Sequence, residues 1–405
     1  MFRIATCLAL VLSFGCNADP GLDPERLEAG KGDETGSCAG TGCEGQAPGG
    51  SCYCDLGCKR YGDCCADYAA VCEAAPPPPG GGAASVPELG ASPTFTTIAT
   101  AADGLDVPRD LTIHPTRDQL WTINQGTEGI TIVSDPGGSR QRAETLIDVM
   151  HEHFMSEPSA IAFGKTGTFA TCQESINHGN HFMGPTLWQT DVYAQVNQEV
   201  GSPLLGSHID MLHQSPLCMG IAHDHDNVYW VFDGQNGHVV RYDFQRDHGP
   251  GYDDHSDGIV RRYPEATLRR RAGVPGHLVL DASTGFLYAA DTGRDRVIRL
   301  DTTTGTATPL APPRNEPLIE YSQVRGATVE VFATGIAGAS GLAIANGRLF
   351  VGSFDTGEIV AVDLATGAEL GRVATGASGL MGLAWGQGKL WFADGVANKV
   401  VRIDP

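Results

Sequence analysis

Residues 275–301 read PGHLVLDASTGFLYAADTGRDRVIRLD and contain the unit that decides the fold of this chain. A short apolar strand follows Pro275, and a turn of small and polar residues leads into a second aliphatic and aromatic strand. That second strand ends at Asp291, and a third strand follows after another turn. Apolar residues recur here at a period of two, which predicts short antiparallel strands joined by tight turns.

The same unit occurs six times, in copies that begin at Pro108, Pro158, Cys218, Pro275, Ala339 and Met381. A repeat of roughly 40 to 60 residues is typical of a four-stranded propeller blade. The last copy ends at Pro405 after three strands, whereas residues 94–101 (TFTTIATA) resemble the fourth strands at 329–334 and 369–375. Because a propeller should leave no exposed sheet edge, we expect this N-terminal strand to close the last blade. The predicted fold class is all-β, a six-bladed β-propeller.

The segment YAADTGRDRVIRLD at residues 288–301 resembles an NHL repeat, and the six copies together resemble six-bladed NHL-type propellers. That broad class contains binding scaffolds and also enzymes, among them the peptide-amidating lyase and the lactonase group. The resemblance therefore implies a fold and does not choose a function.

Eight of the 12 cysteines lie between residues 38 and 72. So short a segment cannot bury enough apolar surface to fold unaided, and this cysteine density predicts a disulfide-rich knot. Zinc binding is the competing interpretation, but an oxidising compartment and the absence of CxxC pairs weigh against it. Cysteine spacing alone leaves the pairing open.

The run CYCDLGCKRYGDCCADYAAVC at residues 52–72 resembles the somatomedin B domain. The resemblance implies a protein-recognition module without catalytic residues, whose contact surface lies around Tyr61, Asp67 and Tyr68; a protease-resistant spacer is the alternative. It also implies four bridges, which pair Cys38 with Cys54, Cys43 with Cys72, Cys52 with Cys65, and Cys58 with Cys64.

The first 15 residues carry Arg3 before the apolar run 4–12, which predicts an export signal. This run is shorter than the roughly 20 apolar residues of a membrane-spanning helix. The sequence LSFGC at 12–16 resembles a bacterial lipoprotein signal, which implies a lipid on Cys16; cleavage after Ala18 is the alternative. We expect a bacterial cell-surface or periplasmic lipoprotein, or otherwise a secreted protein, whose only contact with a membrane is this anchor.

The composition of the remaining chain predicts its organisation. We expect a disordered tether at 16–37, the knot at 38–73, a Pro/Gly linker at 74–93 and the propeller at 94–405. The net charge of -21 disfavours binding to nucleic acids and anionic lipid surfaces. There is no dinucleotide fingerprint, phosphate-binding glycine loop or serine-hydrolase elbow. We expect a monomer.

Three histidines occupy related positions before the first strands of neighbouring blades. His153 and His213 lie eight residues before Ile161 and Ile221, and His277 directly precedes Leu278. If these loops meet at one end of the channel, the imidazoles could hold zinc or copper. The alternative is that they are loop histidines with no common focus.

Two further groups of residues are candidates for a site. Asp253, Asp254 and Asp257 lie in the glycine-rich stretch HGPGYDDHSDG, where they form either a calcium site or a solvated turn. Cys172 ends a second strand and Cys218 begins the first strand of the next blade, so we predict a disulfide between them. Residues 178–212 are an insertion that could cover the channel.

These patterns support two hypotheses for function. The first is an exported recognition protein whose two modules bind extracellular protein, glycan or small ligands. The second is a metal-dependent extracellular lyase or hydrolase with its ion in the propeller channel. The cofactor, if there is one, is expected to be zinc, copper or calcium.

Overall fold

The computed structural model describes residues 36–38, 46–47, 49–52, 54, 64–71, 86–148, 150–164, 167–176, 183–191, 208–250, 252, 254–313 and 316–405. The chain divides into two compact units, Met1–Gly80 and Gly81–Pro405. The export signal, Cys16 and the predicted tether fall outside the described residues, apart from residues 36 and 37 of the tether. Among the described residues, no helix is long and apolar enough to span a membrane.

The first unit has a small core made largely of half-cystines. Disulfides join Cys38 to Cys54 and Cys52 to Cys65, and all four residues are buried together with Tyr68. Tyr68 begins the helix α2 (Tyr68–Val71). Cys64 is also disulfide-bonded, whereas the other three cysteines of the two remaining predicted bridges, Cys43, Cys58 and Cys72, lie outside the described residues. The disulfides supply the core that the short sequence cannot build from apolar side chains.

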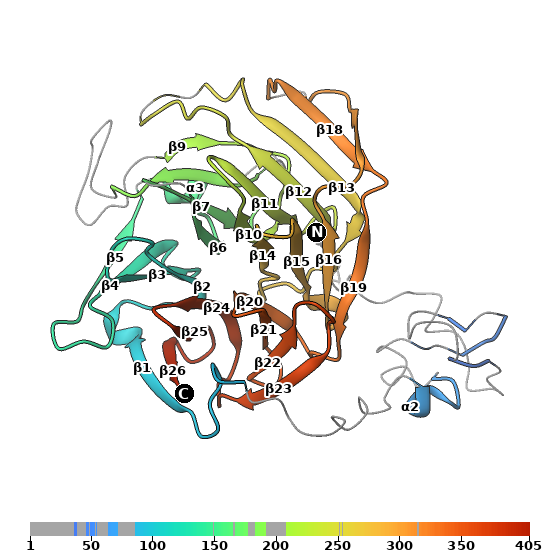
Figure 1. Ribbon diagram of the computed structural model, residues 1–405. Coiled ribbons are helices and arrows are strands. Elements are labelled where there is room, and N and C mark those ends of the chain that lie inside the picture. The colour runs from blue at the N-terminus through green and yellow to red at the C-terminus, as the bar shows by residue number, and fades with distance from the viewer. Residues whose placement is uncertain are drawn as a thin grey trace, which may run out of the picture. The chain divides into compact units, whose positions relative to one another are not determined.

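The second unit is a six-bladed β-propeller, as predicted, and Figure 1 shows its sheets arranged in a ring. The first three blades begin with the strands that the repeat places innermost. Blade 1 contains β2 (Pro108–Ile113), β3 (Gln119–Asn124), β4 (Gly129–Ser134) and β5 (Arg142–Ile147). Blade 2 contains β6 (Pro158–Phe163), β7 (Thr168–Gln173), β8 (Thr186–Gln189) and β9 (His208–Met211). Blade 3 contains β10 (Cys218–His223), β11 (Val228–Asp233), β12 (His238–Asp243) and β13 (Ile259–Thr267).

The remaining blades complete the ring. Blade 4 contains β14 (Leu278–Asp281), β15 (Phe286–Asp291), β16 (Arg296–Asp301) and β19 (Val329–Thr334). Blade 5 contains β20 (Ala339–Ala345), β21 (Arg348–Ser353), β22 (Glu358–Asp363) and β23 (Glu369–Ala374). Blade 6 contains β24 (Leu380–Gly386), β25 (Lys389–Asp394), β26 (Lys399–Asp404) and β1 (Thr94–Thr100). Short helices lie at α3 (His151–Phe154), η2 (Ala101–Asp103) and η3 (Thr292–Arg294).

The N-terminal strand closes the ring, which confirms the three-plus-one arrangement predicted from the sequence. Strand β1 pairs antiparallel with β26, from Thr94 opposite Asp404 to Thr100 opposite Lys399. The Thr96 hydroxyl donates a hydrogen bond to the Asp404 carboxylate at 2.6 Å. Just before this strand, within the predicted linker, Glu88 is buried and accepts a hydrogen bond from Asn346 of blade 5 at 2.6 Å.

Blade 3 differs from the four-stranded expectation. Strands β17 (Thr306–Pro309) and β18 (Glu320–Arg325) leave blade 4 between β16 and β19 and extend the sheet of blade 3 to six strands. Strand β18 runs parallel to β13, and Arg261 forms an ion pair across them with Glu320 at 2.8 Å. This excursion brings Ile319 to the loop between β12 and β13, where it donates its amide hydrogen to the Gly258 carbonyl at 3.0 Å.

The propeller core lies between neighbouring blades. One cluster packs Trp121 of blade 1 against Ile161 and Phe169 of blade 2, and equivalent clusters fill the other interfaces around the ring. Both faces of each sheet are therefore apolar, which explains why the sequence repeat is rich in aliphatic and aromatic residues.

Candidate functional site

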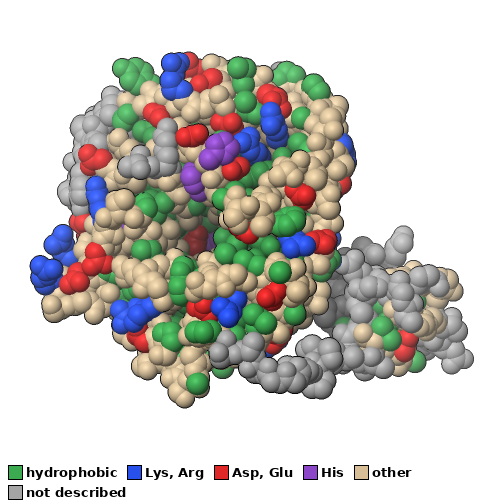
Figure 2. Space-filling view, viewed as in Figure 1, with side chains coloured by type: hydrophobic (Ala, Val, Ile, Leu, Met, Phe, Trp, Pro, Cys, Tyr) green, Lys and Arg blue, Asp and Glu red, His purple; other side chains and the backbone are tan. Residues whose placement is uncertain are grey.

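Histidine side chains gather at one mouth of the propeller, over blades 2 and 3. Figure 2 shows histidines (purple) beside acidic side chains at the rim of the hollow in the middle of the ring. Four segments supply the residues: helix α3, strand β9 with the turn after it, the β12–β13 loop, and the β17–β18 loop. Their candidate ligands are His208, His213, His248, His255 and Glu316, and the ring of His153 lies beside that of His213.

His213 and Glu316 form the buried end of this cluster. Glu316 accepts hydrogen bonds from the backbone N–H of His213 at 2.9 Å and from its ring nitrogen Nδ1 at 2.8 Å. The backbone of His213 is fixed from the other side, since the Tyr242 hydroxyl donates to its carbonyl at 2.7 Å. Nδ1 of His213 and the Glu316 oxygen lie about as close together as two ligands of one metal ion, so both could bind the same ion in place of the hydrogen bond between them.

The ligand atoms form two overlapping groups of three. His213, His255 and Glu316 make one group, and His208, His248 and His255 make the other; within each group the ligand atoms lie within 4.8 Å of one another. The His255 ring is stacked between those of His248 and His213, with centroids 5.2 and 6.2 Å away. Ligands of bound zinc lie about 2.0–2.2 Å from the ion, so small side-chain movements would complete either group.

Burial favours the neutral form of two of these imidazoles, His208 and His153. The pKa of His208 is lowered to about 3 by burial and then by the neighbouring histidines. The pKa of His153 is lowered by burial and by His213. Because a metal ion binds the deprotonated ring, neutral imidazoles at pH 7 suit metal binding.

The carboxylates beside the histidines lack basic partners, whereas four buried carboxylates elsewhere in the propeller have them. Asp233, Asp291 and Glu88 pair with arginines, and so does Glu174. Among the described residues, no arginine or lysine forms an ion pair with the carboxylates around the mouth, namely Asp210, Asp247, Asp257 and Glu316. Buried or crowded negative charge without a cation is costly, so this region suits a bound cation.

Asp210 is the most buried of these carboxylates. It is fully buried on β9, and its Oδ1 accepts a hydrogen bond from the Met211 amide at 2.7 Å. Its Oδ2 is buried and has no hydrogen-bond partner in the described part of the chain. Burial raises the pKa of Asp210 to about 8, with further contributions from the charges of Asp257, Asp247 and Glu316.

The structure brings together two of the three histidines that the sequence singled out. The rings of His153 and His213 are neighbours, with centroids 6.4 Å apart. His277 does not join either ligand group, which corrects the proposed trio. It lies directly before β14 and not several residues ahead of its strand, and its ring is buried against blade 1, where Nε2 donates to the Arg109 carbonyl at 3.2 Å.

The predicted calcium set is not assembled among the described residues. Asp253 lies outside them. Asp254 is exposed, and its carboxylate accepts hydrogen bonds from the amide and hydroxyl of Ser256 in a local turn, which lowers its pKa. Neither Asp254 nor Asp257 belongs to a described group of three candidate ligands. The histidines of the same loop, His248 and His255, carry the candidate site instead.

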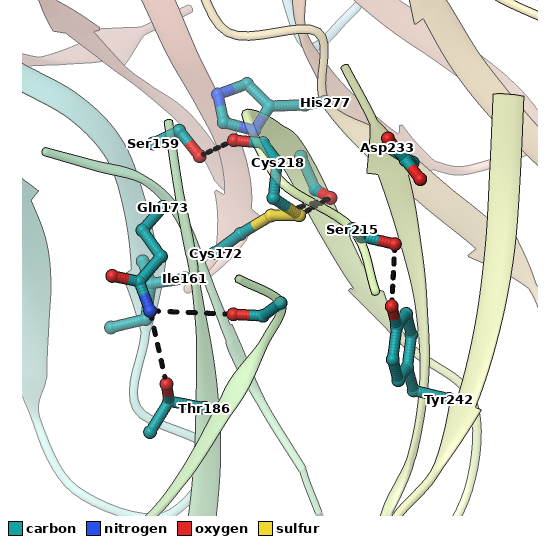
Figure 3. Close-up of a disulfide and its surroundings, with 12 residues drawn as sticks. Ser159, Ile161, Cys172, Gln173, Thr186, Ser215, Cys218, Asp233, Tyr242 and His277 are labelled. Atoms are coloured by element: carbon teal, nitrogen blue, oxygen red, sulfur yellow. Dashed lines mark hydrogen bonds between the residues drawn. A yellow bond between two sulfur atoms is a disulfide. The ribbon is translucent and has the colours of Figure 1, made fainter. Parts of the chain in front are cut away.

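The remaining predicted bridge, between Cys172 and Cys218, is present. It joins the end of β7 to the start of β10, and both residues are fully buried (Figure 3). The Ser159 hydroxyl donates a hydrogen bond to the Cys218 carbonyl at 2.7 Å (Figure 3). The disulfide therefore ties blade 2 to blade 3.

A second buried pair, Asp110 and His277, lies away from the histidine cluster. Nδ1 of His277 is 3.5 Å from Oδ2 of Asp110, and both side chains are buried. Because Nε2 carries the proton that it donates to the Arg109 carbonyl, Nδ1 faces Asp110 as an acceptor. Burial raises the pKa of Asp110 to about 8 and lowers that of His277 to about 4, so at neutral pH the proton of this contact belongs to Asp110.

Asp110→Asn is expected to remove a pH dependence of stability. Folded Asp110 stays protonated up to about pH 8 while the unfolded side chain ionises near 3.8, so its contribution is lost as pH rises between these values. His277 has the opposite effect, because its lowered pKa makes the protein more stable as pH rises from about 4 to its ordinary pKa of 6.5, and this effect ends there. From pH 6.5 to 8 the wild type should lose about 2 kcal/mol relative to the variant.

The measurement is urea unfolding of both proteins at several pH values. The amide of the Asp110→Asn variant cannot both donate to His277 and accept from the Ile161 amide through one atom, as protonated Asp110 does, so a constant offset between the curves is expected. Parallel curves between pH 6.5 and 8 would show that Asp110 is ionised in the folded protein.

Comparison with protein families places the first unit. Residues 36–75 match the Somatomedin B domain. The part of the domain that the structure describes contains two of the bridges that the resemblance implied, Cys38–Cys54 and Cys52–Cys65. A somatomedin B domain joined to a propeller fits a binding or recognition protein, and the domain with its disulfides is consistent with export.

The structure corrects one expectation for the somatomedin B domain. Tyr68 is buried among the half-cystines, so its ring is a core residue and not part of a contact surface. Asp67 accepts hydrogen bonds from the Cys38 amide at 2.9 Å and the Ser37 hydroxyl at 2.6 Å, which holds the start of the domain. Tyr61 lies outside the described residues.

Several solved structures resemble the propeller. An auxiliary nutrient binding protein from Bacteroides thetaiotaomicron VPI-5482 has a TM-score of 0.50 at 9% identity, covering 77% of this chain and 76% of its own. Aldose sugar dehydrogenase from Streptomyces coelicolor has a TM-score of 0.49 at 16% identity, covering 78% of this chain and 99% of its own. The calcium-binding protein regucalcin from Agrobacterium tumefaciens has a TM-score of 0.47 at 14% identity, covering 76% and 93%. The similarity to the auxiliary nutrient binding protein supports the fold alone. A comparison with curated proteins found no match.

Proposed function

We propose that this chain is an exported binding protein whose propeller captures an extracellular ligand at a divalent metal ion in its mouth. The observation that carries the proposal is the group His213, His255 and Glu316, in which two of the three residues are buried and their ligand atoms lie within 4.8 Å. The somatomedin B domain supplies a second, protein-binding surface. The lipoprotein-like segment at Cys16 would keep both modules at the cell surface.

The donor set favours zinc or copper over calcium. Calcium takes six to eight oxygen ligands, whereas imidazole nitrogen suits zinc and copper. Two imidazoles and one carboxylate leave one position of a tetrahedral ion open, and a ligand with a nitrogen, sulfur or oxygen donor could fill it. Protein, glycan and small-molecule ligands all offer such donors.

Metal content tests this proposal. The tag-free, full-length protein should retain zinc or copper after dialysis, and His213→Ala should weaken binding at least 10-fold. His225→Ala is the matched control, because His225 is largely exposed on the β10–β11 turn and lies in neither ligand group. A wild type that binds no zinc or copper, or a His225→Ala variant as impaired as His213→Ala, contradicts the proposal.

A metal-dependent lyase or hydrolase is the second candidate. Catalytic zinc sites keep three protein ligands and an open position, and the group of two histidines and Glu316 fits that pattern. In such an enzyme His213, His255 and Glu316 would hold the ion, which would supply an activated water or polarise a carbonyl. Hydrolysis or elimination that is lost in His213→Ala and kept in His225→Ala would select this candidate.

A further inference from the structure

The two ligand groups at the mouth occupy separate positions that share one ring. No described group contains all five ligands, and His208 and His213 never occur in the same group. His255 belongs to both, and its ring is nearly parallel to that of His248, with an interplanar angle of 9°. One ion therefore cannot use every donor, because His208 at one end of the cluster and His213 at the other are too far apart to bind the same ion.

The outer group has the hydrogen bonding expected of histidine ligands. His248 donates from Nδ1 to the Gly249 carbonyl at 2.6 Å, which leaves the lone pair on Nε2. This Nε2 is buried and has no hydrogen-bond partner in the described part of the chain. His208 is held by stacking on Phe154, with ring centroids 3.8 Å apart. A ring oriented by a backbone carbonyl, with its other nitrogen buried and unpaired, is prepared for a metal.

Charge also favours more than one ion. The mouth contains the carboxylates of Asp210, Asp247, Asp257 and Glu316, and the structure pairs none of them with a described arginine or lysine. Asp247, Asp257 and Glu316 can together carry three negative charges, so one divalent ion would leave part of this charge uncompensated.

We propose that the mouth holds two zinc-class ions, one bound by His213, His255 and Glu316 and the other by His208, His248 and His255, with the His255 ring as the shared ligand. This inference rests on the proposed metal function and adds a second ion to it. A ring that binds an ion through each nitrogen must lose its N–H proton. Binding of the second ion therefore releases that proton to solvent, and the resulting imidazolate adds one negative charge between the ions.

The stoichiometry of zinc binding tests this proposal. Equilibrium dialysis of tag-free, full-length protein should give two equivalents for the wild type and for the His225→Ala control. His248→Ala should remove only the outer ion and His213→Ala only the inner one, leaving one equivalent each. His255→Ala should weaken both. Circular dichroism and tryptophan fluorescence would verify that each variant is folded.

A second measurement tests the shared ring. Calorimetric titration with zinc in buffers of different ionisation enthalpy measures the number of protons released on binding. At saturation the wild type should release about one proton more than His248→Ala, because only the wild type binds the second ion. If the wild type binds one equivalent of zinc and His248→Ala binds the same amount, the proposal of a second ion is wrong and the proposed function stands. If the wild type and His255→Ala both bind two equivalents of zinc with equal affinity, His255 is not a shared ligand. No metal at all would overturn the proposed function itself.

Discussion

Replacing Ile98 by aspartate is expected to lower the free energy of unfolding of the propeller by about 5 kcal/mol. Ile98 lies on β1, the strand that closes the ring, and its side chain is 4% exposed. It packs with Val133 of blade 1 and with Trp391 and Val400 of blade 6. An aspartate there would be a buried charge without a partner and would leave the space of the isoleucine poorly filled, so β1 should detach from β26.

Thr97→Asp is the matched control. Thr97 precedes Ile98 on the same strand but is exposed, so the same charge should change stability by no more than about 0.5 kcal/mol. Urea unfolding followed by tryptophan fluorescence reports on the propeller, since all five tryptophans of the chain lie in it. Equal destabilisation by the two substitutions would mean that burial of Ile98 does not hold the ring closed.

The closure of the ring could be predicted from the sequence because it follows from counting strands. The last repeat lacks a fourth strand, and residues 94–101 have the pattern of one. The detail of that strand could not be predicted: the register shifts between Thr97 and Ala99, so that Ile98 and Ala99 are both buried. A bulge breaks the period of two, which is the signal that the sequence offers.

The added strands of blade 3 could not be predicted for a different reason. Strands β17 and β18 belong by sequence to blade 4, and their segment reads as a long loop between a third and a fourth strand. Their pairing with β13 is parallel and depends on a neighbouring blade. Sequence patterns give the strands of a segment more readily than the distant strand with which they pair.

The candidate site shows the same division. His153 and His213 could be recognised because they precede equivalent strands by the same interval, and their rings are neighbours. His248 and His255 could have been found in HGPGYDDHSDG, where the aspartates drew the interpretation toward calcium. Glu316 gave no signal, because the excursion from blade 4 brings it to His213 across 103 residues of sequence.

Loss of the Cys172–Cys218 disulfide is expected to destabilise the propeller by about 4 kcal/mol. The bridge closes a loop of 46 residues, and opening it increases the conformational entropy of the unfolded chain. That loop includes the insertion at residues 178–212, which lies between the two cysteines in the sequence. The double variant Cys172→Ala/Cys218→Ala should also show a larger denaturant m-value, because its unfolded state is less compact.

Reductant provides an internal control for this prediction. Dithiothreitol should move the tryptophan-detected unfolding midpoint of the wild type to that of the double variant, and should leave the midpoint of the variant unchanged. The bridges of the somatomedin B domain are reduced in both proteins, so they do not affect the comparison. If the double variant unfolds at the wild-type midpoint, the hydrogen bond from Ser159 to the Cys218 carbonyl and the apolar packing around both residues are sufficient to hold blades 2 and 3 together. The expected difference arises because a covalent bond restricts the unfolded chain, which packing and hydrogen bonds do not.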